Sequence, residues 1–236
     1  MPYWTLDGED PPTIQLRQVG PNAFQLLNGF RFARREGAVP PVITVPPHDP
    51  SRPPSRGNAT DLASVPWFLW WFISSHGRQT PAALLHDHLV IEPQFDRRLA
   101  DLVFREALAE SGVSWVRRWV MWAGVTLATR AKVDRLRLLL LVGHLLASFI
   151  LVGLWLFGRQ VSGWWAVSSM LAGAAWGVLW PLMVMSFVLL GPATFAVGVS
   201  VSVVYIIELA GNVIGALRGR AFELPRPVPY RSNRWR

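Results

Sequence analysis

Two consecutive predicted helices, at residues 81–91 and 96–110, each carry one side chain that could take part in acid–base chemistry. His86 in the first helix and Asp101 in the second stand at matching distances from the turn that joins them. In an antiparallel hairpin the two side chains would therefore meet. A carboxylate that accepts the imidazole N–H fixes the tautomer and raises the basicity of the ring. The spacing predicts a dyad in which His86 is a general base.

The same residues allow a second interpretation, in which His86 and Asp101 form a buried hydrogen-bonded pair that only joins the helices. Asp87 points about 100° away from His86 around the helix. It is therefore expected either to bind a cation or to make structural hydrogen bonds. His88 is expected to face the solvent.

A second polar segment, residues 60–66, has the sequence Thr-Asp-Leu-Ala-Ser-Val-Pro. Thr60, Asp61 and Ser64 are candidate site residues. In the alternative interpretation, Asp61 and Ser64 bond to backbone groups of a turn before a helix. No G-x-S-x-G elbow surrounds Ser64, which disfavours a nucleophilic role.

Several classes of site are excluded by what the chain lacks. It contains no cysteine, which rules out disulfides, thiolate zinc sites and cysteine nucleophiles. No phosphate-binding P-loop, G-x-G-x-x-G fingerprint or H-E-x-x-H zinc motif occurs either.

Residues 1–112 are predicted to be a soluble α+β domain that positions these side chains. Asn28-Gly29 predicts a hairpin turn, so we expect a small β-meander, followed by a loop over 46–59 and by the helical hairpin. Gly112 is the expected stop of the second helix. The expected strands are residues 13–19, 24–26, 30–32 and 42–45.

The apolar run Trp67–Ile73 is too short to span a bilayer. It is expected either to pack in the core or to form a patch at a membrane interface, where Trp is favoured.

Charge is distributed unevenly along the chain. The net charge is +8, and residues 111–236 hold 13 basic but only 3 acidic side chains. These basic residues flank long apolar segments, a pattern typical of contact with anionic lipid headgroups. We therefore expect the lipid bilayer as a partner and no nucleic acid, while any protein partner is unknown.

The C-terminal half is predicted to be an α-helical multi-pass membrane region with about three spans. Pro181 is expected to kink the second span, and the last two spans are expected to meet near Gly191-Pro192. The predicted parts are an amphipathic basic segment at 113–137, a region at 138–216 with spans 138–157, 164–190 and 192–214, and a basic tail at 217–236.

His144 and Glu208 are ionisable residues inside the predicted spans, which makes them candidates for a transport pathway. The basic flanks at both ends of the region favour an even number of spans by the positive-inside rule, whereas the lengths favour three. A cytoplasmic soluble domain is the favoured orientation.

A series of short motifs follows in order along the first half of the chain. They are Asn28-Gly29-Phe30-Arg31-Phe32, Ile43-Thr44-Val45-Pro46, Thr60-Asp61-Leu62-Ala63-Ser64-Val65-Pro66, Ala82-Ala83-Leu84-Leu85-His86-Asp87, and Arg98 with Ala100-Asp101 and Phe104. With these motifs, residues 24–111 resemble an uncharacterised family of bacteria and tailed phages, catalogued as domain of unknown function 1353. The resemblance implies no activity.

A helical His-Asp pair followed by an Asp on the next helix is also similar to the layout of A2-class phospholipases. That likeness implies His86 as the base, Asp101 as the carboxylate that orients it, and Asp87 as a ligand of a divalent cation such as calcium. Asp61 is added here as a further metal ligand. The sequence departs from that family in lacking a glycine-rich calcium loop and disulfides, and in having Val90 where Tyr is expected.

Two main functions remain open. The chain is either a membrane-anchored interaction module or a membrane-surface hydrolase that acts on lipid or envelope material with the His86–Asp101 dyad. A small transporter is a third possibility.

Overall fold

The computed structural model describes residues 2–10, 12–63, 65, 69, 71–74, 76–158, 161–218, 221, 222 and 224. Ser64, residues 67, 68 and 70 of the apolar run, and most of the predicted basic tail lie outside this described part. The chain forms two compact units, one made of residues 1–113 and 192–236 and the other of residues 114–191.

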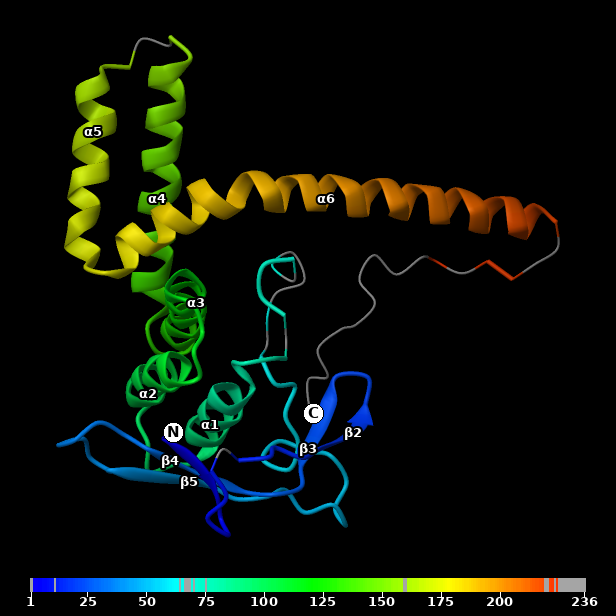
Figure 1. Cartoon of the computed structure of the whole chain (residues 1–236). Coiled ribbons are helices and arrows are strands. Elements are labelled where there is room, and N and C mark those ends of the chain that lie inside the picture. The colour runs from blue at the N-terminus through cyan, green and yellow to red at the C-terminus, as the bar shows by residue number, and fades with distance from the viewer. Residues whose placement is uncertain are drawn as a thin grey trace. The chain divides into compact units, whose positions relative to one another are not determined.

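In the described part of the first unit, five short strands form two separate antiparallel sheets (Figure 1). One sheet has the strand order β1-β4-β5, and the other is the hairpin β2-β3. The strands are β1 (Tyr3–Thr5), β2 (Leu16–Gly20), β3 (Ala23–Leu26), β4 (Phe30–Ala33) and β5 (Val42–Val45). The α+β class is confirmed, but the single β-meander is wrong.

The error lies at Asn28-Gly29, which does not form a hairpin turn between β3 and β4. The Asn28 side chain instead accepts the Gln15 N–H at 2.7 Å and donates to the Thr13 carbonyl. These bonds tie the chain back to residues before β2. At Gly29 a Cβ atom would come within 2.7 Å of the Val45 carbonyl oxygen, so the chain enters β4 pressed against β5. Side-chain bonding therefore overrides the local turn signal.

In the core of this unit, buried and exposed side chains alternate along β4. Phe30 and Phe32 are buried while Arg31 between them is exposed, as expected for a strand with one covered face. Tyr3 of β1 packs on Phe32 with ring centroids 4.8 Å apart. The helices α1 and α2 lie beside this sheet in Figure 1 and contribute the remaining buried apolar side chains.

The helical hairpin is confirmed, with α1 at Thr80–Ile91 and α2 at Arg97–Glu110. Pro81 lies in the first turn of α1, where its missing N–H costs no intrahelical hydrogen bond. Gly112 adopts a left-handed φ of +69°, which ends α2 as predicted.

Two polar contacts hold α2 on the three-stranded sheet. The Arg34 guanidinium pairs with Glu106 at 3.1 Å, with side-chain exposures of 7% and 22%. The Tyr3 hydroxyl donates to the Ala107 carbonyl at 2.9 Å, and burial raises the pKa of this phenol well above its usual range. Because both contacts reach the turns of α2 that follow Asp101, they help to fix that residue in place.

The predicted amphipathic segment 113–137 is divided between α3 (Trp115–Val133) and α4 (Arg135–Leu156). Asp134 is the N-cap of α4, and its side chain accepts the Arg137 N–H at 3.1 Å. The basic collar therefore occupies the end of one helix and the start of the next. Its members are Arg130, Lys132, Arg135 and Arg137.

A continuous helix over residues 164–190 does not form. The helix α5 ends at Ala172 after starting at Gly163, and a short 3-10 helix, η2 (Gly173–Trp176), follows it. Gly177 then takes a left-handed φ of +68°, which turns the chain. Of the segment that was expected to be one span, α5 and η2 thus return alongside α4 as the second leg of a hairpin, and the rest belongs to the next helix (Figure 1).

The expected break at Gly191-Pro192 is also absent, because α6 runs from Leu179 to Leu217 with Pro192 inside it. Proline removes one intrahelical hydrogen bond, which apolar helices tolerate. Pro181 lies in the first turn of α6, where its missing N–H has no intrahelical partner to lose.

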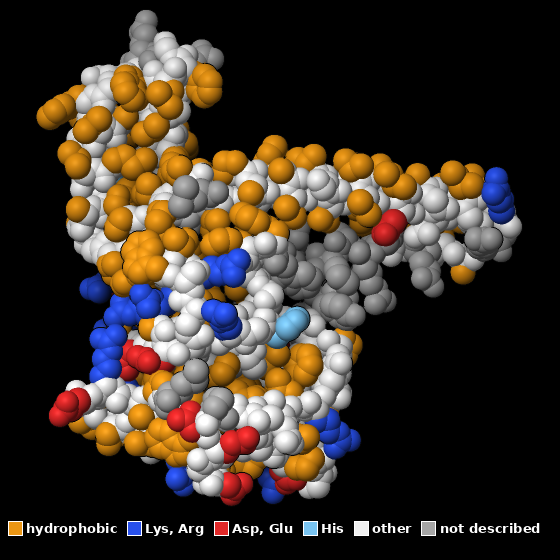
Figure 2. All heavy atoms as spheres, in the orientation of Figure 1, with side chains coloured by type: hydrophobic (Ala, Val, Ile, Leu, Met, Phe, Trp, Pro, Cys, Tyr) orange, Lys and Arg blue, Asp and Glu red, His pale blue; other side chains and the backbone are white. Residues whose placement is uncertain are grey.

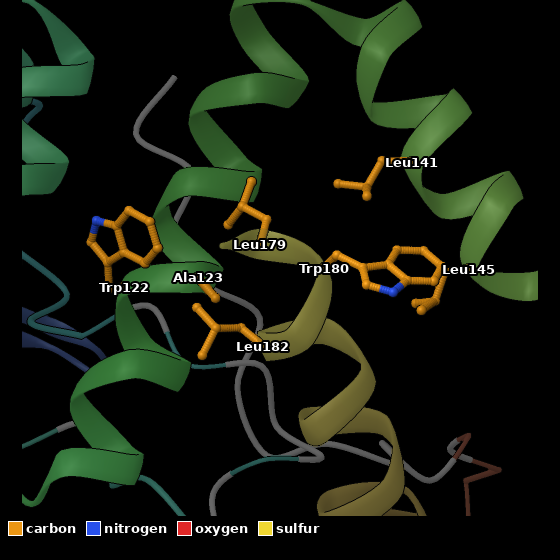
Figure 3. Packing of buried hydrophobic residues seen from close by; sticks show 7 residues of the cluster. All are labelled: Trp122, Ala123, Leu141, Leu145, Leu179, Trp180 and Leu182. Atoms are coloured by element: carbon orange, nitrogen blue, oxygen red, sulfur yellow. The ribbon is translucent and has the colours of Figure 1, made fainter. Parts of the chain in front are cut away.

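Buried apolar side chains of α3, α4 and the start of α6 form the core of the second unit (Figure 3). The cluster comprises Trp122, Ala123, Leu141, Leu145, Leu179, Trp180 and Leu182. Trp180 also packs so tightly on Gly173 that a Cβ there would lie 1.8 Å from its ring. The glycine is therefore required where η2 passes this indole.

Two described helical stretches are long and apolar enough to cross a membrane, namely α4 and residues 190–217 of α6. Residues 179–188 form a shorter apolar stretch. By length and composition, two candidate spans replace the three that were expected. Figure 2 shows hydrophobic side chains over the surfaces of α4, α5 and α6.

Candidate functional site

The His86–Asp101 contact is present between α1 and α2. The Nε2 atom of His86 lies 3.0 Å from Oδ1 of Asp101. Because a carboxylate accepts hydrogen bonds, this contact puts a hydrogen on Nε2, so that in the neutral ring the lone pair lies on Nδ1. No described residue forms a hydrogen bond with that Nδ1 atom. The geometry is that of an oriented base, while the catalytic role stays a prediction.

Burial differs between the two partners of the dyad. The Asp101 side chain is 4% exposed, whereas His86 is 15% exposed. On the α2 side, the Phe104 ring packs on the imidazole with centroids 5.0 Å apart. The carboxylate is thus sealed behind the histidine, and part of the imidazole remains open to the solvent.

Asp87 lies next to the dyad and is bonded by Thr60, the first residue of the 60–66 segment. The Thr60 hydroxyl donates to Oδ2 of Asp87 and accepts the Leu62 N–H at 2.9 Å. Leu62 adopts a left-handed φ of +61°, an uncommon conformation for a leucine. Two backbone hydrogen bonds of 2.9 Å pin Thr60 to Phe24 of β3. The segment at Thr60 therefore pairs with the edge of the β2-β3 hairpin, and the Thr60 side chain contacts α1.

The environment of Asp87 favours its protonated form. The pKa of this carboxyl is raised to about 7, chiefly by burial and also by the negative charge of Asp61, against the lowering effects of the Thr60 hydrogen bond and of His86. Asp87 therefore changes its charge near neutral pH.

Two further histidines lie near this site. His88 is half-buried, and burial lowers its pKa, so the expectation that it faces the solvent is wrong. The loop residue His48 accepts the Leu26 N–H on Nδ1 at 2.9 Å, and its pKa is lowered by burial and by His88. His48 was missed in the sequence because it lies far from the helices and belongs to no motif.

The loop that carries His48 is held in shape by two amides. The buried Gln25 side chain donates to three loop carbonyls at 3.2 Å, those of Asp49, Arg52 and Asn58. Asn58 in turn donates to the carbonyls of Asp49, Arg52 and Pro53. This loop is therefore built by side chains, which explains why its Pro- and Ser-rich sequence indicated no fixed structure.

The structure gives no support to the predicted calcium site. Within the described part of the chain, no three His, Asp or Glu side chains are grouped so that they could hold a metal ion. Asp87 is engaged by Thr60, and Asp61 is half-buried nearby. Ser64 cannot be placed because it lies outside the described residues. The metal role of Asp87 and Asp61 thus gains no support.

The apolar run before α1 matches neither prediction throughout. Ile73 is buried, as a core residue would be, whereas Trp71 is exposed. The described part of the run therefore contains both a core residue, Ile73, and a surface residue, Trp71.

His144 of α4 is fully engaged within the second unit. Its Nδ1 accepts the Trp176 indole N–H at 2.9 Å, and its Nε2 donates to the Ser169 carbonyl at 3.0 Å. A hydrogen bond of 2.6 Å joins the hydroxyls of Ser148 and Ser169 beside it. Glu208 is exposed on α6 and bonds to no residue that the structure describes. Neither residue extends the site on α1 and α2.

The comparisons with known proteins agree with the resemblance seen in the motifs. Residues 53–125 match the family model of DUF1353, a protein of unknown function. The DUF1353 match covers Thr60, the whole of α1 and α2, and the first part of α3. It begins after the strands and overlaps the expected range of 24–111 over residues 53–111. No curated protein and no solved structure matches the chain.

Proposed function

We propose that the DUF1353 domain is a hydrolase in which His86 is the general base, and that the apolar helices hold it at a membrane. One observation carries this proposal. The carboxylate that orients His86 is sealed in the core, while the imidazole keeps a partly exposed ring and an unoccupied Nδ1 among the described residues.

The reaction assigns each side chain one task. His86 Nδ1 takes a proton from water, and the resulting hydroxide attacks a carbonyl or phosphoryl centre of the substrate. Asp101 stabilises the imidazolium that forms, and the proton on Nδ1 passes to the leaving oxygen when the scissile bond breaks. Lipid or envelope esters are the proposed substrates because the apolar helices would keep the domain beside them.

A matched pair of variants tests the base. His86→Gln places an amide N–H where Nε2 donates to Asp101 but supplies no basic nitrogen, and His88→Gln makes the same change two residues later. We expect the full chain to hydrolyse a fluorogenic ester phospholipid or an envelope preparation, with activity lost in His86→Gln and kept in His88→Gln.

Circular dichroism and the thermal midpoint check that both variants stay folded. Full activity of a folded His86→Gln variant would exclude His86 as the base. Asp101→Asn keeps an acceptor for the imidazole without the charge, and its activity should fall less than that of His86→Gln.

The alternative function is a non-catalytic interaction module that is displayed at a membrane. The observation in its favour is that Asp87 and Thr60 satisfy each other, as polar groups in a purely structural contact do. In that case the wild-type chain would hydrolyse none of the probes, and His86→Gln would only lower the thermal midpoint. We do not extend the proposal to transport, because both ring nitrogens of His144 are occupied.

A further inference from the structure

The helices α4 and α5 carry an outer surface that is almost entirely apolar. Ile150, near the middle of α4, is 61% exposed. Other exposed apolar side chains on the two helices are Leu139, Leu140, Leu146, Leu154, Val167 and Leu171. A contiguous surface of this kind is rare on soluble monomers and marks contact with another phase or another protein.

Three polar side chains of the same helices, those of His144, Ser148 and Ser169, make contacts between them. Ser148 is fully buried, and its hydroxyl bonds to that of Ser169 across the hairpin. His144 donates to Ser169 and accepts from Trp176, so both of its ring nitrogens have partners. A soluble helical hairpin turns its polar residues outward and its apolar residues inward. This hairpin has the opposite polarity, which is what a hydrocarbon surrounding demands.

The two ends of the hairpin carry different kinds of exposed side chain, and both kinds are common at membrane–water interfaces. Arg135 and Arg137 are exposed at the start of α4. At the far end, the exposed large side chains are aromatic or apolar, namely Trp155, Leu156, Phe157, Trp164 and Trp165. Arginines suit anionic headgroups, and tryptophans favour the interfacial layer. Between these ends, the 22 residues of α4 rise about 33 Å, close to the hydrocarbon thickness of about 30 Å.

From these observations we infer that α4, α5 and η2 form a hairpin inserted into a lipid bilayer. It enters from the side of the basic collar, its aromatic end reaches the opposite interface, and α5 with η2 returns toward the entry side. His144 joins the two legs inside the membrane. This inference deepens the membrane association in the proposed function and does not depend on the hydrolase activity.

Single cysteines can test this arrangement directly, because the chain has no cysteine of its own. The variants are Val133→Cys at the basic end, Ile150→Cys on the outer surface and Ser162→Cys at the aromatic end, all at exposed positions. Each full chain is treated with a charged, membrane-impermeant maleimide in right-side-out and in inside-out vesicles of the expression host.

We expect the cysteines at positions 133 and 162 to react in opposite kinds of vesicle. The cysteine at position 150 should react in neither until the protein is denatured. Reaction of positions 133 and 162 from the same side would overturn the inference, as would rapid labelling of position 150 in intact vesicles.

A second copy of the chain could cover the same surface instead of lipid. In that case alkaline carbonate would release the protein from membranes as a soluble oligomer in which position 150 stays protected, and the inference would fail. The labelling pattern is read without any substrate. If no hydrolysis were found, the proposed function would fail, but the labelling pattern would still test the membrane hairpin.

Discussion

Each unit of this protein holds one histidine between two packed helices, and the two histidines differ in what their second nitrogen does. In the first unit, His86 bonds through Nε2 to a buried carboxylate, and its Nδ1 bonds to no described residue. In the second unit, His144 uses both nitrogens on neutral partners. An imidazole with a charged orienting partner and a free lone pair can accept a proton. One with both nitrogens engaged serves to join helices.

The largest expected effect is the difference in hydrolytic activity between variants of the two histidines. His86→Gln should lower kcat/KM by about 100-fold or more, the usual contribution of a general base. His144→Gln should leave kcat/KM within a few-fold of the wild type once folded protein is compared. Hydrolysis of a fluorogenic ester phospholipid measures both. An equal loss in the two variants would remove the distinction.

The second prediction concerns the pH dependence of stability in the first unit. Asp87 has its folded pKa raised from 3.8 to about 7, so between these values the folded state holds a proton that the unfolded state has lost. Stability should therefore fall as the pH rises through this window and level off above it. Asp87→Asn removes that dependence and should be more stable than the wild type at pH 8, by about 2–4 kcal/mol.

Thermal midpoints of the full chain from pH 4 to pH 8 measure this effect as the difference between variant and wild type. Asp7→Asn is the matched control, because Asp7 is exposed. If the two variants showed the same pH dependence, the Asp87 carboxyl would not be perturbed by its surroundings.

The third prediction compares an ion pair from each unit. Arg34→Met leaves the mostly buried Glu106 without its cation and should cost about 2–3 kcal/mol of unfolding free energy. Arg137→Met breaks the exposed pair with Asp134 and should cost less than about 0.5 kcal/mol. Denaturant titration of both variants measures the difference. Equal losses would contradict the difference in burial.

The last prediction concerns the contact inside the α4–α5 hairpin. His144→Phe keeps an aromatic ring but leaves the Trp176 indole N–H without its described acceptor, and it removes one of the two hydrogen bonds that the Ser169 carbonyl accepts. We expect a loss of about 1–2 kcal/mol, the cost of a polar group left unpaired where water is scarce. The thermal midpoint in detergent is the measure. An unchanged midpoint would show that the two hydrogen bonds do not join the legs.

The sequence predicted the site best where it depends on local structure. The bounds of α1 and α2 agree with the positions of Pro81 and Gly112, although neither N-cap side chain makes a capping hydrogen bond, and the His86–Asp101 contact follows from those bounds and helical geometry. The sequence could not predict the Thr60–Asp87 bond or the place of His48. Both come from segments that reach α1 through the sheets, and nothing in their local pattern encodes which strand pairs with which.

The apolar second half of the chain shows the same division. Apolar length alone identified α4, because twenty or so apolar residues have few alternatives to a helix. The end of α5 and the continuation of α6 through Pro192 were not predicted. Gly173, the C-cap of α5, packs against Trp180 of α6, and a contact between residues on different helices is invisible to periodicity.

By itself, the sequence determined which residues could do chemistry, the helical hairpin that brings two of them together, and the apolar character of the second half. Only the tertiary structure decided the pairing of the strands, the engagement of Asp87 by Thr60, and the different surroundings of His86 and His144. Local propensity and spacing act within a few turns of chain. The chemistry of a side chain, in contrast, depends on its burial and its partners, which segments distant in sequence supply.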